Sequence, residues 1–300
     1  MTAAFEENEI VPRSVFAPRS AFRGVIGATV AAGAIMVLDL AADPALAQSR
    51  LEARYAVSLA GVPVGKGAWV IDIAENQYTA AASGATAGLL RVFASGQGSG
   101  ASRGFMVGGN PVPASFAASI TSDKKTEEIR MTLASGDVKE FAVTPQLPDD
   151  PERVPVTEAH THGVSDPMTG TLFRVPGTGD PVGPQACQRT TPIFDGRMRY
   201  NLQFAYKRME KVKADKGYEG PVVVCAVYFT PLAGYVPHRS SIKYLTAQRD
   251  MEVWFAPVGG SRMLVPFRVS IPTPIGVGVM QATQFVAVSA PPHAAAVKTQ

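Results

Sequence analysis

The sequence predicts an all-β protein built mainly from antiparallel strands, and three observations support this prediction. Glycine and proline are abundant, with 28 glycines and 24 prolines in 300 residues, which favours many turns over a helical bundle. Several stretches alternate apolar and polar residues with the two-residue period of a strand. Asp195-Gly196 joins two such stretches and is among the strongest two-residue hairpin signals. We therefore expect many short strands connected by hairpins.

The predicted strands follow one another along most of the chain. A hairpin of residues 51–59 and 68–73 opens the domain. Residues 222–230 (VVVCAVYFT) are almost entirely apolar, which predicts a central strand. The other strands are expected at 77–82, 114–121, 126–133, 137–144, 188–194, 197–212, 240–246, 251–256, 263–271 and 277–288.

Two short helices are expected among these strands. Residues 85–93 (ATAGLLRVF) lose the two-residue period, and their Leu and Phe side chains would bury the segment. A second helix is expected at Asp166-Pro167, because an aspartate can cap the free N–H groups and a proline suits the first turn. Its buried side would be formed by Met168, Leu172 and Phe173.

A run of glycines precedes the strand at 114–121. Gly96, Gly98, Gly100 and Gly104 stand among small residues, but no Lys-Ser or Lys-Thr pair directly follows a glycine of this run, as it would in a phosphate-binding loop. Glycines within a strand more often mark bulges or close backbone approach, which fits a strongly curved sheet.

Residues 48–289 are expected to form a single β-rich domain. Residues 145–155 hold four prolines and three acidic residues, so we interpret 145–164 as a surface excursion within that domain. Residues 290–300 are expected to be a disordered tail. The formal charge of +3 comes without any basic stripe carrying interleaved aromatics, and nucleic acid is therefore not an expected partner.

The first 47 residues are interpreted as a signal peptide. Residues 24–38 are apolar and uncharged, but the stretch is too short to span a bilayer comfortably. Ala45-Leu46-Ala47 fits the small-residue rule for signal peptidase, so cleavage is expected after Ala47. We expect a periplasmic protein without a stable membrane span after cleavage. The acidic start of the chain leaves an uncleaved anchor as the alternative.

The chain has two cysteines, Cys187 and Cys225. In an oxidising compartment two thiols of one domain usually pair, which predicts a disulfide. The alternative is two unpaired buried thiols, because the sequence does not give the separation of their Cα atoms.

No catalytic, metal or cofactor site is expected. His160 and His162 would need Glu158 or Asp166 to complete a zinc site, and a solvated pair is the simpler interpretation. Residues 100–104 (GASRG) have the Gly-x-Ser-x-Gly spacing of a nucleophile motif, but they belong to the glycine run that we interpret as strand and do not stand at a turn from a strand into a helix. We therefore expect a protein that is not an enzyme.

The order of several segments resembles a family of uncharacterised exported bacterial proteins, domain of unknown function 3108. The matching segments are YAVSLAGVPVGKGAWVI, the Gly88-Leu89-Leu90 stretch, Ser165-Asp166-Pro167, PIFDGRMRYNL, VVVC and the closing MEVWFA and PFRVSIPTPIGVGVMQA. The resemblance implies one curved antiparallel sheet, a half-barrel or β-spiral with one or two short helices against its concave face. The implied fold is similar in outline to periplasmic lipoprotein carriers and to β-spiral envelope-integrity proteins. The resemblance implies no reaction.

Two functions remain open on these grounds. In the first, the concave face binds an apolar or lipid-like ligand, such as a lipid or lipoprotein of the envelope. The expected lining residues are Trp69, Ile71, Leu89, Phe93, Tyr228 and Trp254, for which an ordinary core is the competing interpretation. In the second, the protein supports envelope integrity through protein contacts at strand edges and binds no small molecule.

Overall fold

The structure, a computed structural model, describes residues 49–87, 96–122 and 125–289 of the 300-residue chain. Every described residue belongs to one compact unit. The described residues form long antiparallel strands with one α-helix. The predicted all-β class is therefore confirmed.

Fifteen strands form one sheet in this part of the chain. They are β1 (Ser49–Leu59), β2 (Val62–Ile73), β3 (Gln77–Thr86), β4 (Gly96–Val107), β5 (Asn110–Ser122), β6 (Lys125–Ala134), β7 (Asp137–Thr144), β8 (Phe173–Arg174), β9 (Arg189–Phe194), β10 (Arg199–Lys213), β11 (Lys216–Gly217), β12 (Glu219–Ala233), β13 (Glu252–Pro257), β14 (Met263–Thr273) and β15 (Gly276–Ser289). The helix is α1 (Ser240–Ala247), and short 3-10 turns are η2 (Glu158–Thr161), η3 (Thr169–Thr171) and η4 (Pro184–Cys187).

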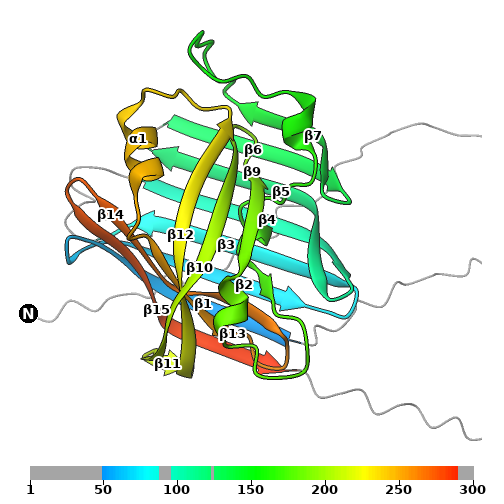
Figure 1. The fold of residues 1–300 in the computed structure, drawn as a ribbon, viewed down its shortest axis with the longest axis vertical. Helices are drawn as coiled ribbons and strands as arrows, with labels where there is room; N and C mark the ends of the chain where they lie inside the picture. Colours follow the sequence, from blue (N-terminus) through cyan, green and yellow to red (C-terminus); the bar gives the residue numbers. More distant parts are fainter. Residues whose placement is uncertain (1–48, 88–95, 123–124, 290–300) are drawn as a thin grey trace, which may run out of the picture. The chain divides into compact units, whose positions relative to one another are not determined.

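The strands lie in the order β7-β6-β5-β4-β3-β2-β1-β15-β14-β13-β12-β10-β9 (Figure 1). Most neighbours are consecutive hairpin strands, but β1 pairs with β15, so the first and last strands hold the sheet together at its middle. The short strands β8 and β11 pair with β14 and β15. The ends of the paired sheet are therefore β7 and β9.

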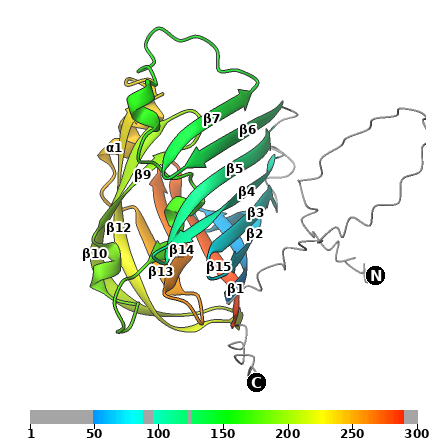
Figure 2. The ribbon, with the colours of Figure 1, turned by 90° about the vertical axis from the view of Figure 1, so that its right-hand side faces the viewer.

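These two ends approach each other without pairing. The rings of Phe141 in β7 and Phe194 in β9 meet edge to face, with their centroids 5.0 Å apart. Arg197, just after β9, forms an ion pair with Glu127 of β6. Figure 2 shows β2–β7 in one layer and β9, β10 and β12 in another. The sheet is thus one large curved but open sheet, as expected.

The core consists of clusters of buried apolar side chains. The largest joins residues of β1–β3 to residues of β12–β15. A second cluster packs Phe173 against Phe204 and Phe255, with ring centroids 4.8 and 4.2 Å away. Alternate residues of β12 enter the two clusters, so both faces of this strand are buried. Burial of both faces explains the continuous apolar sequence of β12.

Residues 240–246 were predicted as a strand, and this prediction is wrong because they form helix α1. Ile242 and Leu245 are half-buried and three residues apart, a spacing that suits one face of a helix. Thr246 completes the turn by donating its hydroxyl hydrogen to the Ile242 carbonyl, at 2.9 Å. In such a short segment, helix and strand periodicities are hard to distinguish.

The two predicted helices have different outcomes. β3 continues to Thr86, so residues 85 and 86 are strand, and the rest of the predicted helix from residue 88 lies outside the described residues. After Asp166 the chain makes only the 3-10 turn η3, although Leu172 and Phe173 are buried as expected. Gly170 is packed tightly against Ile193 and Thr191, and the chain soon enters β8, which leaves no room for a longer helix.

Candidate functional site

Three of the predicted ligand-binding residues lie in the largest core cluster. Trp69, Ile71 and Trp254 are 8%, 0% and 5% exposed and belong to the same group of packed side chains. Tyr228 is half-buried on β12. Leu89 and Phe93 lie outside the described residues. The structure therefore brings three of the six together, and their role in binding a ligand stays a prediction.

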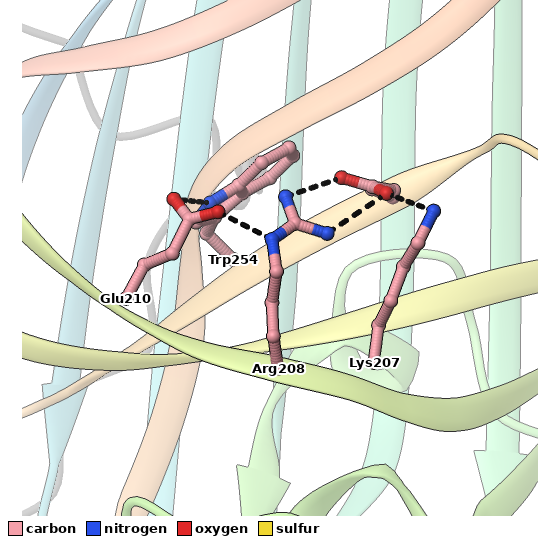
Figure 3. Close-up of polar contacts among 5 residues, drawn as sticks. Lys207, Arg208, Glu210 and Trp254 are labelled. Carbon is pink, nitrogen blue, oxygen red and sulfur yellow. Dashed lines mark hydrogen bonds and ion pairs between the residues drawn. The ribbon is translucent and has the colours of Figure 1, made fainter.

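Trp254 is also part of a group of charged side chains (Figure 3). Arg208 of β10, Val224 of β12, Trp254 of β13 and Arg268 of β14 are paired in register across four strands. The Trp254 indole N–H donates to a Glu210 carboxylate oxygen at 2.7 Å. The guanidinium carbons of Arg208 and Arg268 lie 5.4 and 4.8 Å from the indole ring centroid, within cation–π range.

Glu252 is the centre of the ion pairs in this group. Arg208 donates two hydrogen bonds to its two carboxylate oxygens, at 3.0 and 2.9 Å, and Lys207 forms a further ion pair with it. The hydrogen bonds from Arg208, with a smaller contribution from Lys207, lower the pKa of Glu252 to about 2 despite its burial. These carboxylates are fully engaged, so the group stabilises the packing of β10, β12 and β13.

Acid titration should reveal this ion-pair group. Because the pKa of Glu252 is lower in the folded state than its ordinary value of 4.5, the stabilisation is present above about pH 4.5 and is lost as the pH falls towards 2. Over this range we expect the free energy of unfolding to fall by about 1 to 2 kcal/mol more in wild type than in Glu252→Gln. This figure is smaller than the pKa shift alone would give, because water screens the partly exposed ion pair. Urea denaturation at several pH values measures the difference.

Glu140→Gln, which removes an exposed carboxylate of β7, is the matched control and should retain the wild-type acid dependence. Equal acid sensitivity in wild type and Glu252→Gln would contradict the assigned role of Glu252.

A second polar group lies around the buried side chain of Asp166. Its carboxylate accepts hydrogen bonds from the Ser102 hydroxyl at 2.9 Å, the Thr169 hydroxyl at 2.5 Å and the backbone N–H groups of Met168 and Thr169 at 2.9 and 3.0 Å. The Tyr78 hydroxyl lies 2.6 Å from the Thr169 hydroxyl. Asp166 therefore caps the following turn as predicted and also fastens it to β3 and β4.

Burial raises the pKa of Asp166, while the four donors act in the opposite direction. A buried carboxyl with a raised pKa is a feature of many active sites. Here, however, the Ser102 and Thr169 hydroxyls and two backbone N–H groups all hold the carboxylate, which is what a structural anchor requires. We interpret the Asp166 group as structural.

The two histidines of the excursion make separate contacts. His162 Nδ1 lies 3.2 Å from an Asp137 carboxylate oxygen, and His160 Nδ1 accepts a hydrogen bond from the Thr157 N–H at 3.0 Å. Asp166 lies elsewhere, in its own buried group. Among residues 49–87, 96–122 and 125–289, no group of three or more His, Cys, Asp or Glu is arranged to hold a metal ion.

The predicted Cys187–Cys225 disulfide is present, with an S–S distance of 2.00 Å and a Cα–Cα distance of 5.5 Å. It links η4 to the centre of β12 within the second core cluster. The segment before β9 is thereby fixed to a central strand.

An open groove runs beside the edge strand β7. Its volume is about 450 Å³, and it is lined by Phe141, Ala142, Val143, Thr144, Gln146, Leu147 and Gly196. Phe141 is 47% exposed although one ring edge meets Phe194. β7 pairs with β6 on one side and has no paired strand on the other among the described residues. This groove combines an accessible apolar surface with a free strand edge, and it is the candidate functional site.

The chain following β7 returns to the start of this strand, where the Val164 N–H donates to the Gly136 carbonyl at 2.7 Å and the Gly163 N–H to an Asp137 carboxylate oxygen at 3.2 Å. Val154 and Gly234 lie in the excursion and after β12, and backbone hydrogen bonds join Val154 N to Tyr235 O and Gly234 N to Val154 O, each at 2.8 Å. The excursion is thereby fixed beside the end of β12. The sequence indicated the strand and the excursion, but the position of β7 at the end of the sheet depends on the whole strand order.

The chain was compared with known proteins. Residues 54–283 match the family described as "Protein of unknown function (DUF3108)". None of the curated proteins matches the chain. One solved structure is similar, a beta-barrel-like protein of domain of unknown function DUF1849 from Brucella abortus. It has 8% sequence identity and a TM-score of 0.45, and the match covers 82% of this chain and 100% of that one. Within the described residues, no helix is long and apolar enough to cross a membrane.

Proposed function

The chain belongs to the DUF3108 family of proteins of unknown function, and we propose that it is a non-enzymatic protein of the cell envelope that binds an extended segment of a partner protein along β7. The observation that carries this proposal is the free edge of β7 beside an open apolar groove. An extended peptide can add a strand to such an edge, with main-chain hydrogen bonds giving affinity and a groove accepting side chains.

The character of β7 supports this mode of binding. Natural proteins usually protect an edge strand by making it very short, placing charges on it or covering it. β7 has eight residues, and its final four, Phe141–Thr144, carry no charge. These four residues also line the groove, so the uncharged half of the edge coincides with the accessible apolar surface.

The envelope location rests on the sequence. The apolar stretch 24–38 and the Ala45-Leu46-Ala47 site predict export, and a disulfide suits an oxidising compartment. Exported protein should begin at Gln48. The partner is accordingly sought among envelope proteins.

Binding of an apolar or lipid-like ligand is the second candidate. It is favoured by the Trp69 indole N–H, which is buried and has no acceptor among the described residues, within an aromatic cluster. Trp69, Ile71 and Trp254 are closely packed, however, so a ligand would have to displace side chains. The groove at β7 is already open, and we therefore place protein binding first.

Photo-crosslinking in the source cells tests the proposal. A benzoyl-phenylalanine at Ala142, which is exposed and lines the groove, should form a defined adduct with an envelope protein. The same probe at Ser241, exposed on α1, is the matched control and should not yield that adduct. The captured segment, made as a peptide, should bind the purified wild type and lose most of its affinity for Ala142→Trp, which fills the groove.

Adducts that form equally from both positions, or a captured peptide that binds Ala142→Trp as well as wild type, would refute protein binding at β7. Native mass spectrometry with lipid extraction distinguishes the second candidate. A co-purified lipid that Trp69→Phe no longer retains would support ligand binding in the core.

A further inference from the structure

Two hairpin tips lie side by side at one end of the sheet, away from the groove residues. Figure 1 shows the β1–β2 tip and the β14–β15 tip next to each other on the left. Their contact is direct, because the Ala60 N–H donates to the Val277 carbonyl at 2.9 Å and Gly276 is packed against Ala60. The two tips therefore form one surface.

This surface carries exposed apolar side chains. We define the hairpin-tip patch as Val62, Ile271, Ile275 and Val277, which are 51%, 38%, 73% and 44% exposed. No Asp, Glu, Lys or Arg occurs between Arg54 and Lys66 or between Arg268 and Lys298. Isolated exposed apolar residues are common, but several of them gathered on two contacting hairpin tips, whose segments carry no charge, indicate an interaction site.

The backbone of the β14–β15 tip has few unsatisfied polar groups. The Thr273 hydroxyl donates to the Gly276 carbonyl at 2.6 Å, and the Ile275 N–H approaches the Thr273 hydroxyl oxygen at 3.4 Å. Pro272 and Pro274 have no N–H to satisfy. An apolar medium strongly disfavours free N–H and C=O groups, so this tip is suited to enter one.

Cationic side chains lie behind the patch. Lys66 and Arg54 are exposed, and Lys66 is four residues from Val62, about 13 Å along the strand. An apolar tip followed by basic residues matches the order of a bilayer surface, in which acyl chains lie below anionic headgroups. A surface that binds another protein more commonly has an apolar centre surrounded by a polar rim.

We propose that the hairpin-tip patch inserts into the interfacial region of a lipid bilayer, with Lys66 and Arg54 facing anionic headgroups. The proposal does not depend on strand addition at β7. The protein would then be held at a membrane surface while β7 remains free.

Vesicle co-sedimentation tests this proposal, using the chain from Gln48 onward, which contains the whole described unit. Wild type should bind vesicles of phosphatidylethanolamine with phosphatidylglycerol more strongly than vesicles of phosphatidylcholine alone. Ile275→Asp should lower the partition coefficient about tenfold, because a charge would enter the interface. Val62→Asp, on the other tip, should act in the same direction.

Phe105→Asp is the matched control, because Phe105 is 59% exposed and lies near the β4–β5 turn at the opposite end of the sheet. Its partition coefficient should equal that of wild type. In a second measurement, brominated lipids should quench the fluorescence of the tryptophan introduced by Ile275→Trp, and should not quench that of the tryptophan introduced by Phe105→Trp.

Absence of vesicle binding by wild type, unchanged binding of both tip variants, or an equal loss in Phe105→Asp would overturn the proposal. If wild type binds neither kind of vesicle and a photo-crosslinker at Ile275 captures a protein, the patch binds a protein partner instead. Thermal unfolding of each variant shows whether a loss of binding follows from a loss of fold.

Discussion

Replacing Asp166 by alanine is expected to lower the free energy of unfolding by about 3 to 5 kcal/mol. The carboxylate accepts four hydrogen bonds in a buried position, and its removal leaves two backbone N–H groups and two hydroxyls without their acceptor. Each buried unsatisfied group costs about 1 to 3 kcal/mol, and part of this cost is recovered by local rearrangement. Chemical denaturation measures the change.

Asp72→Ala is the matched control for this experiment. Asp72 forms a partly exposed ion pair with Arg50, at 2.8 Å, so its loss should cost less than about 1 kcal/mol. A loss of similar size in Asp166→Ala and Asp72→Ala would show that the Asp166 group does not anchor the turn to β3 and β4.

Removing the disulfide by replacing Cys187 and Cys225 with alanine is expected to cost about 3 to 4 kcal/mol. The bridge closes a loop with a sequence separation of 38, and the chain-entropy model gives this value for a loop of that length. The two sulfur atoms are also fully buried in the second core cluster, so the substitution removes packing as well. Thermal and urea unfolding of the double variant measure the loss.

Reduction of wild type provides the comparison for the double variant, because it breaks the bridge and keeps both side chains. Reduced wild type should lie between the oxidised protein and the variant in stability. Equal stability of the oxidised and reduced proteins would contradict a stabilising role for the bridge.

Local patterns predicted the strands well because most neighbours in this sheet are hairpin partners. Asp195-Gly196 and Ser135-Gly136 mark two of the turns, and the apolar run in β12 indicates that both of its faces are buried. The failure at 240–246 has a physical cause, since Ile242 and Tyr244 fit the two-residue period of a strand, Ile242 and Leu245 fit the period of a helix, and only packing against the rest of the protein selects the helix.

The candidate sites were less predictable because they depend on long-range register. Trp69, Ile71 and Trp254 were expected to lie together, and they do. The contact between Arg208 and Glu252 requires the pairing of β10, β12 and β13 and a bulge near Tyr206, none of which can be obtained from residue spacing. Likewise, the groove exists only because β7 ends the sheet.

Hydrogen exchange of the β7 amides tests the central claim most directly, namely that a partner adds a strand at this edge. The purified protein would be measured alone and with the peptide captured from Ala142. Strand addition predicts slower exchange at alternate amides of residues 138–144, because only every second N–H of an edge strand faces outward. Unchanged exchange along β7 while the peptide is bound would contradict the claim.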